Sequence, residues 1–288
     1  MSEMNDINEI LTHLKQTTAF ADSNKKWDFY KKYPYSISSI VEKLKPEFDK
    51  QAAAERTHKK YFWNNKSEYY QKSVEEILTM WENKSAVGRM NGKVLDHFIG
   101  MILEDNATNE EITKYMGTLE HAALNKCKMW LRFYDQYLGP NAGENKIEFL
   151  GRELCMCDDK YGVNGRLDAL FGFKNNILVI DWKNTENIST SCPFENMNGP
   201  LYKYEKTDLN SYTMQLYGYV YMLRTDYGLT INQIIPLLVQ VGMYSMYTYS
   251  PVIPYSDSLV QECFAYAIEK IDAERKAKEV SGEAVMDK

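Results

Sequence analysis

Two aspartates and a lysine in the middle of the chain have the types and spacing to act on a charged substrate. Residues 177–183 read ILVIDWK, an apolar run typical of a buried strand that ends with Asp181 and Lys183. Asp168 lies 13 residues before Asp181, in GRLDALFGF, which also has the character of a strand. Residues 174–176, KNN, predict a tight turn, so the two strands would form a hairpin with both carboxylates near the same end of a sheet.

The chemistry of these three side chains favours metal-assisted hydrolysis. Lys183 follows Asp181 by two positions, so both leave the strand on the same face. Two adjacent carboxylates repel each other and stay ionised at low cost only when a cation joins them, and oxygen ligands favour Mg²⁺ or Mn²⁺. Such a cation lowers the pKa of a bound water, and a nearby ammonium orients that water or neutralises developing charge. The residues therefore indicate phosphodiester hydrolysis. The alternative is an exposed strand end with Asp168 in a turn, because D-x-K is short and common.

The hydrophobic pattern predicts the elements that must position these residues. Residues 1–130 are mainly helical in character, and a long helix is predicted over 109–138, ended by Gly139-Pro140. The remaining elements are predicted as three strands (147–157, 165–173, 177–183), a polar loop (185–208), a helix (211–228), two strands (233–243, 244–252) and a closing helix (256–279). This order predicts an α/β fold. We expect a helical N-terminal region, 1–140, and a core, 141–288, that form one integrated domain.

Composition narrows the class of protein. The chain has 288 residues, of which 44% are hydrophobic and 26% charged, as in an ordinary globular protein. A net charge of −6 argues against a nonspecific coat on nucleic acid but leaves room for a local basic cleft. The sequence predicts no membrane span, because no apolar run approaches the roughly 18 residues that a span needs. It predicts no secretory signal, because its start, MSEMNDINEI, is polar and acidic. Five cysteines without CxxC spacing favour a reducing, cytoplasmic compartment, and we expect no membrane partner.

The motifs around the aspartates resemble a known family. GRLDAL followed by VIDWK is similar to the PD-(D/E)xK nuclease superfamily, and most of all to its RecB-like branch, which includes phage recombination exonucleases and the mitochondrial genome maintenance exonuclease. The branch carries a Q-x-x-x-Y helix, matched by Gln215 and Tyr219, and an acidic residue one strand earlier, matched by Glu153. YPYSISSIVEKLKPEFD and MWENKSAVGRMNGKVLDHFI resemble its opening segments.

The resemblance implies both a fold and a set of roles. The fold would be a restriction-endonuclease-like core, with a central mixed sheet flanked by helices and an N-terminal helical region. Asp168 and Asp181 would bind the metal, with the backbone carbonyl of Trp182 as a further ligand. Lys183 would lie beside the attacking water, and His97 would reach the metal from the helical region.

A second group of residues is predicted to contact DNA. The resemblance implies that Gln215 and Tyr219 line the DNA path. The stretch LYKYEKTDLNSYTMQLYGY also holds Lys203 and Tyr212, of types that neutralise phosphates and stack on unpaired bases. The alternative is that most of these tyrosines pack the helix onto the sheet.

One departure from the family pattern concerns the helical region. The branch places a glycine four residues before its histidine, whereas Gly92 lies five before His97, so strict spacing selects Asp96. Either side chain can bind a metal. We expect His97, because its residue type matches and its helix face is apolar, and a structural histidine is the alternative. For Glu153, a metal contact and a salt bridge are alternative roles.

The expected cofactor is Mg²⁺ or Mn²⁺ alone. Some relatives hold an iron–sulfur cluster through one early and three late cysteines, but only Cys263 follows the glutamine motif here, so no cluster is expected. No glycine-rich phosphate loop is present, so no nucleotide cofactor is expected either.

These features together predict a metal-dependent DNA nuclease. The first expectation is an exonuclease that hydrolyses DNA from its ends in recombination, replication or repair. Its partners would be single-stranded or end-containing DNA and recombination or replication proteins, in a host cytoplasm if the source is a phage. The alternatives are a structure-specific endonuclease on the same core and a non-catalytic DNA-binding scaffold protein.

Overall fold

The computed structural model describes residues 7–139 and 147–281. The chain forms two compact units. The core unit comprises Met1–Pro46 and Lys128–Lys288, and the helical unit comprises Glu47–Cys127. These units divide the chain after residues 46 and 127. The expected boundary between 140 and 141 lies outside the described residues. The first helices join the core unit because they pack on the sheet, which a helical periodicity does not specify.

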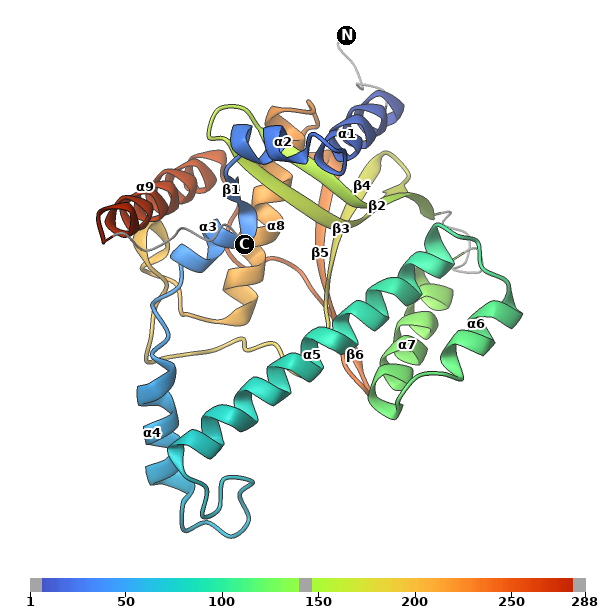
Figure 1. The fold of residues 1–288 in the computed structure, drawn as a ribbon. Helices are drawn as coiled ribbons and strands as arrows, with labels where there is room; N and C mark the ends of the chain where they lie inside the picture. The colour runs from blue at the N-terminus through green and yellow to red at the C-terminus, as the bar shows by residue number, and fades with distance from the viewer. Residues whose placement is uncertain (1–6, 140–146, 282–288) are drawn as a thin grey trace. The chain divides into compact units, whose positions relative to one another are not determined.

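The core unit is an α/β structure built on a mixed six-stranded sheet (Figure 1). The pairing order is β1-β3-β4-β5-β6, and β2 pairs with the other edge of β3. β2–β3, β3–β4 and β5–β6 are antiparallel, whereas β1–β3 and β4–β5 are parallel. The strands are β1 Tyr35–Ser36, β2 Ile147–Asp158, β3 Val163–Phe173, β4 Asn176–Lys183, β5 Ile234–Val241 and β6 Met246–Tyr249.

Strand β3 has a gap in its pairing that matters for the site. β2 follows β3 along nearly its whole length, so β1 and β4 share the opposite edge. β1 pairs with β3 at residues 163–164, and β4 pairs with it from Ala169 to Phe173. Among the strands that the structure describes, none therefore pairs with residues 165–168 of β3 on that edge. The hairpin turn before β4 contains Lys174 at a φ of 56°, so the predicted tight connection is confirmed.

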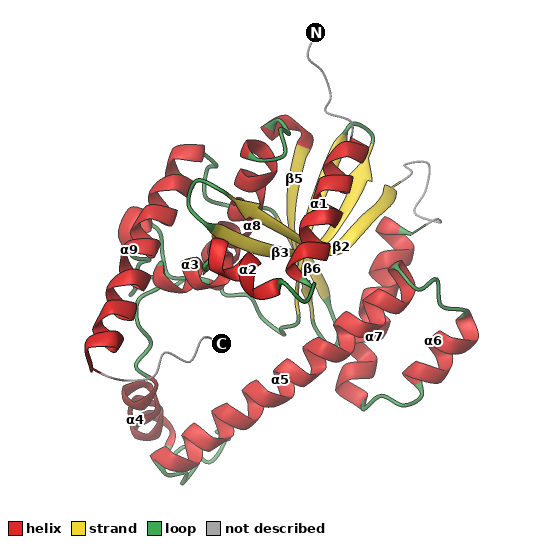
Figure 2. Cartoon of the chain, turned by 45° about the horizontal axis from the view of Figure 1, so that its top comes forward, coloured by secondary structure: helices red, strands yellow, loops and turns green. Residues whose placement is uncertain are grey.

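Helices of the core unit pack around this sheet (Figure 2). Helix α8 contacts β2, β3, β4 and β5, and α3 and α9 pack against α8 and each other. Helix α1 packs against β2 and beside α2. A Cβ at Gly218 in α8 would clash with Ile37 of α3, so a glycine is needed for this close approach. The helices are α1 Ile7–Ala21, α2 Lys26–Lys32, α3 Ile37–Lys43, α8 Asp208–Thr225 and α9 Asp257–Ser281.

Helix α3 begins with a side-chain cap. Its N-cap is Ser36, whose hydroxyl accepts a hydrogen bond from the Ser39 N–H at 3.1 Å. The short strand β1 that precedes it was not predicted. A pair of residues has no period to detect, and β1 pairs in parallel with Val163, far along the chain.

The polar segment between β4 and α8 is tied to the core. A single bridge joins Asn196 to Glu205, and the short 3₁₀ helix η2 (Gly199–Leu201) lies between them. The Asn198 N–H donates to the carbonyl of Leu44 at 2.8 Å, and its side-chain amide donates to the carbonyl of Lys45 at 2.8 Å.

The helical unit contains α4 Lys50–Tyr61, α5 Val74–Leu103 and α6 Asn109–Met116, and α7 His121–Phe133 crosses into the core unit. Helix α5 starts with a capping box of Ser73 and Glu76. The prediction of one long helix over 109–138 is wrong. The chain forms two helices, α6 and α7, separated by residues 117–120, and a π-helical turn, Tyr134–Leu138, follows α7. Among the described residues, no helix combines the length and apolar character needed to cross a membrane.

Candidate functional site

The candidate site lies where β3 and β4 separate. Their pairing ends at Ala169 and Ile180, one residue short of Asp168 and Asp181. The Trp182 N–H then donates to Asp168 Oδ2 at 2.7 Å. This side-chain oxygen takes the place of the backbone carbonyl that would accept the next hydrogen bond between the two strands. The indole of Trp182 packs against Trp130, with ring centroids 5.8 Å apart. Asp168, in the middle of β3, and Asp181, near the end of β4, therefore lie side by side just beyond the last paired residues of the hairpin.

Lys183 is fixed by three neighbours. Its Nζ forms an ion pair with Asp181 Oδ2 at 2.7 Å and donates to Gln215 Oε1 at 3.0 Å. It also lies 4.6 Å from the ring centroid of Tyr212, within the range of a cation–π contact. Asp181 and Lys183 thus lie on the same face of β4, as their spacing predicted. The other two neighbours of Lys183, Gln215 and Tyr212, belong to α8.

A chain of hydrogen bonds connects Lys183 to the unpaired part of β3. The Gln215 amide donates to the Tyr219 hydroxyl at 3.1 Å, and that hydroxyl donates to the carbonyl of Arg166 at 2.9 Å. This carbonyl lies in residues 165–168 of β3, which pair with β2 on one edge and with no described strand on the other. Tyr219 is 2% exposed, so in this structure its side chain offers no surface to a ligand. It instead holds the orientation of Gln215, and through it Lys183.

The carboxylates are electrostatically unfavourable as they stand. Desolvation and the charge of Asp181 raise the pKa of Asp168 well above its usual range, although Asp168 as a whole residue is half-buried. Burial also raises the pKa of Asp181, while Lys183 opposes that change. Burial by itself would lower the pKa of Lys183, but the charges of Asp181 and Asp168 outweigh it and leave that pKa raised. The lysine therefore stays protonated.

The donor set fits a hard divalent cation. Asp181 is 1% exposed, and its Oδ1 has no hydrogen-bond partner in the described part of the chain. An unpartnered carboxylate oxygen in this position costs about 1–3 kcal/mol unless a ligand satisfies it. When both are ionised, Asp168 and Asp181 carry two negative charges against one positive charge on Lys183, and a bound cation would offset the excess that raises the pKa of Asp168. Mg²⁺ is commonly held by one or two carboxylates, with waters and substrate phosphates completing its shell.

No larger cluster is present to do the same work. Within residues 7–139 and 147–281, no group of three or more His, Cys, Asp and Glu side chains is arranged to hold a metal ion. A cation at Asp168 and Asp181 would therefore need oxygen atoms from the backbone, water or substrate.

Glu153 lies in β2 next to this region and has an unusual backbone. Its φ is 51°, in the left-handed region that residues with a Cβ rarely adopt. Its carbonyl accepts from the Arg166 guanidinium at 3.0 Å, and its Oε2 lies 3.9 Å from Arg166 Nε. The charge of Glu153 contributes to the raised pKa of Asp168. The contact with Arg166 agrees with the salt-bridge interpretation, and a metal contact stays a prediction.

The other predicted residues are placed as follows. His97 and Asp96 are exposed on α5 of the helical unit, and the His97 ring lies 5.1 Å from that of Tyr115. Their roles as metal ligands stay predictions. Lys203 is exposed in the loop before α8, where its Nζ lies 5.3 Å from the ring of Tyr204.

Two supporting residues were missed in the sequence. Gln240 is buried in β5, opposite Lys183, and its amide donates to the carbonyl of Glu186 at 2.7 Å. A polar residue near the end of the apolar run IIPLLVQV was the available signal. Arg166 pairs with Asp22 at 2.6 Å, and no local pattern announces that contact because the partners are far apart in sequence.

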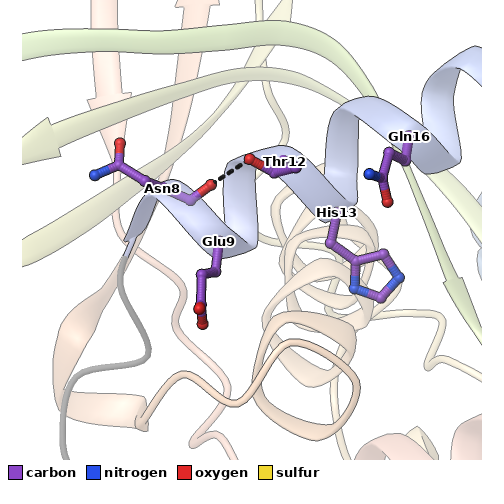
Figure 3. Close-up of a pocket in the computed structure, with 5 residues that line it drawn as sticks. All are labelled: Asn8, Glu9, Thr12, His13 and Gln16. Carbon is purple, nitrogen blue, oxygen red and sulfur yellow. Dashed lines mark hydrogen bonds between the residues drawn. The ribbon is translucent and has the colours of Figure 1, made fainter.

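Hollows on the surface lie elsewhere. One is lined by Asn8, Glu9, Thr12, His13 and Gln16, which all project from α1 (Figure 3). Another joins α1 to the segment after α8, at residues 225–228. Neither is lined by a proposed site residue. The five residues of the first hollow are all exposed, as expected for an ordinary helix surface.

Comparisons with known proteins give little further information. No protein-family model and no curated protein matches the chain. Among solved structures, the chain is similar to a crystal structure of a "putative exonuclease" from Eubacterium rectale. Sequence identity is 9% and the TM-score is 0.36, over 91% of this chain and 87% of that one. Because this score is too low to establish a common fold, we base the functional assignment on the site itself.

Proposed function

We propose that this protein is a metal-dependent deoxyribonuclease with a PD-(D/E)xK core, and that it acts as an exonuclease on DNA ends. The observation that carries the proposal is the environment of Asp181. Within the described residues, its buried carboxylate has one oxygen without a hydrogen-bond partner and the other paired with Lys183, and Asp168 lies beside it in the middle of the adjacent strand β3. A bare strand end would leave such a carboxylate in water.

The two aspartates would hold Mg²⁺ or Mn²⁺, with the Trp182 carbonyl as the further ligand that the family resemblance implies. When bound, this ion would lower the pKa of a water and neutralise charge on a phosphoryl oxygen. Asp168 would approach it with Oδ1, because Oδ2 accepts from the Trp182 N–H. The backbone thereby fixes the orientation of this carboxylate.

Lys183 would act as a cation rather than as a general base. Its raised pKa keeps it protonated, and an ammonium has three N–H donors but no acceptor. Asp181 and Gln215 take two of these donors. The third would orient the attacking water or neutralise charge as the water attacks phosphorus and the leaving oxygen departs.

Gln215 and Tyr219 would serve as positioning residues for Lys183. Gln215 contacts Lys183 directly, and the buried hydroxyl of Tyr219 fixes the Gln215 amide. This assignment replaces the expected DNA contact for Tyr219, because a buried phenol cannot reach a strand. Contacts of Tyr212 and Lys203 with DNA remain part of the proposal.

A cleavage assay would test the proposal. Wild-type protein, Asp181→Ala and Asp226→Ala would be incubated with end-labelled linear DNA and closed circular DNA, in Mg²⁺, Mn²⁺ or EDTA. Asp226→Ala is the matched control, because it removes an exposed aspartate outside the site. We expect metal-dependent loss of linear DNA by wild type and the control, and none by Asp181→Ala.

Each other outcome has a definite meaning. Cutting of the circle that requires Asp181 would select the endonuclease. DNA binding without cleavage of any substrate, unchanged in Asp181→Ala, would select the scaffold protein. Equal cleavage by wild type and Asp181→Ala would refute the assignment of the site.

A further inference from the structure

Helix α2 presents aromatic and basic side chains on one exposed surface. We call Lys25, Lys26, Trp27, Tyr30 and Lys31 the α2 surface. Trp27 is 69% exposed and Tyr30 is 40% exposed. They are three residues apart, so their rings lie on the same side of the helix, about 5–6 Å apart at Cβ. Helix α2 lies beside α1 in the core unit, as Figure 1 and Figure 2 show.

Packing of α2 accounts for part of the Tyr30 ring, whose centroid lies 5.2 Å from that of Phe29, but not for the exposed ring of Trp27. Helix α2 is anchored by Phe29, which is buried and lies 5.6 Å from Phe20 and 5.0 Å from Tyr33 between ring centroids. The Tyr33 hydroxyl donates to Asp159 at 2.7 Å. The buried side therefore fixes the helix, and Trp27 projects from a rigid base.

The charges on this helix are also unexplained by helix stability. Lysines favour the C-terminal end of a helix, which accounts for Lys31, but they are unfavourable at the N-terminal end. Lys25 is the N-cap and makes no side-chain capping bond, and Lys26 follows it. Lys26 Nζ lies 5.8 Å from the Trp27 ring centroid. In the described part of the chain, Lys25, Lys26 and Lys31 form no ion pair. The whole chain carries a net charge of −6, so this surface is a local excess of basic residues, with Asp28 as the one acidic residue of the helix.

We propose that the α2 surface binds an unpaired nucleic-acid strand. Two adjacent aromatic faces offer stacking for successive bases, and the three lysines around them can neutralise the phosphates. A duplex hides its base faces within the helix, so it cannot use Trp27 in this way. A protein partner would use the rings but would leave three unpaired lysines without a specific role unless it were acidic.

This surface is distinct from the candidate active site but lies in the same unit. Asp22, in the turn before α2, pairs with Arg166, which is two residues before Asp168 on β3. A strand held on α2 would thus be anchored beside the element that carries Asp168. The inference does not depend on the proposed cleavage, since binding is measured separately.

Binding of a labelled 20-nucleotide oligo(dT) would test the inference, by fluorescence anisotropy in EDTA so that no metal-dependent cleavage occurs. The variants are Trp27→Ala, Trp27→Phe, Lys25→Ala/Lys26→Ala/Lys31→Ala, and the control Tyr244→Ala. Tyr244 is a matched control, because it is 71% exposed in the core unit and has no lysine beside it. Thermal melting would establish that each variant is folded.

We expect Trp27→Ala to weaken binding roughly 5- to 100-fold, and Trp27→Phe to retain most of the affinity because a ring remains. The lysine variant should reduce the slope of log affinity against log salt by about 2, at about 0.7 per phosphate contact. Tyr244→Ala should bind as wild type.

Three results would overturn the inference. One is an affinity for oligo(dT) that does not change in Trp27→Ala and the lysine variant. Another is an equal loss in Tyr244→Ala. The third is an equal loss for a blunt duplex of the same length, which would indicate a general electrostatic contact. If the cleavage assay fails while the Trp27 effect persists, the proposed enzyme is wrong but the α2 surface stands.

Discussion

Gly165 offers a direct test of how α8 positions the lysine of the site. An alanine Cβ at this place in β3 would lie 2.7 Å from Tyr219 Cε1 and 3.0 Å from Ile37 Cγ1. The Tyr219 ring cannot swing away freely, because its hydroxyl bonds both the Arg166 carbonyl and Gln215. We therefore expect Gly165→Ala to move Tyr219 and Gln215, and with them Lys183.

The expected magnitude follows from two opposing effects. Overpacking a close contact of this kind costs about 1–3 kcal/mol. Replacing glycine by alanine also gains about 0.4–1 kcal/mol, because the unfolded chain loses freedom. The net expectation is a destabilisation of about 1–2 kcal/mol. Gly172→Ala, in the same strand, is the matched control, since its nearest atom would lie 3.6 Å away. It should be neutral or slightly stabilising.

Two assays separate the structural effect from the positioning effect. Urea unfolding followed by circular dichroism gives the change in midpoint for both variants. Cleavage of end-labelled DNA, at equal amounts of folded protein, should fall at least about tenfold in Gly165→Ala, as expected for a small misplacement of a catalytic group. Equal midpoints for the two variants would refute the packing argument. A destabilised Gly165→Ala with undiminished cleavage would refute the link from Tyr219 to Lys183.

Three further changes give distinct results. Gln215→Leu removes an acceptor of Lys183 and should reduce cleavage roughly 10- to 100-fold, with little change in the thermal midpoint; a loss of folded protein instead would assign Gln215 a structural role. Glu153→Gly relieves a φ of 51° and should raise the free energy of unfolding by about 1 kcal/mol; unchanged stability in urea would contradict this strain. Asp226 is exposed as a whole residue, but partial desolvation of its carboxylate and the charges of Asp158 and Asp159 raise its pKa to about 6, so the folded form holds the proton more tightly than the unfolded chain does. The stability it contributes is complete below about pH 4 and is lost as the pH rises through about 6. Asp226→Asn should therefore have a higher free energy of unfolding than wild type at pH 8, by up to about 1 kcal/mol after allowance for the exposure of this residue, but not at pH 4. A higher stability of the variant at pH 4 and not at pH 8 would contradict this prediction.

The hairpin explains why the centre of the site could be predicted from sequence. β3, β4 and α8 have strong periodic patterns, and a short turn fixes which residues of β3 and β4 face each other. Asp168, Asp181 and Lys183 were therefore brought together by local information. Gln215 lies on α8, and its contact with Lys183 was not specified by local pattern, although the family resemblance singled out that residue.

Features that depend on distant packing could not be predicted in this way. The break after Met116 is one example, since a glycine costs only about 1 kcal/mol within a helix and tertiary contacts decide whether the helix continues. The division into units is another. Helices 7–21 and 37–43 belong with the sheet because α1 packs on β2 and α3 on α8, and neither partner is visible in a helical period.

Three departures from favourable folding coincide around the middle of β3, and their coincidence is the strongest argument for function there. In the described part of the chain, residues 165–168 lack a strand partner on one edge, Asp181 buries a carboxylate oxygen without a hydrogen-bond partner, and Glu153 adopts a left-handed backbone. Each costs on the order of 1–3 kcal/mol, and such costs persist where a ligand or a reaction makes use of them. Tyr219 compensates only the first, by bonding the Arg166 carbonyl. Nothing in the described residues compensates the cost at Asp181, and the cation proposed above would offset it.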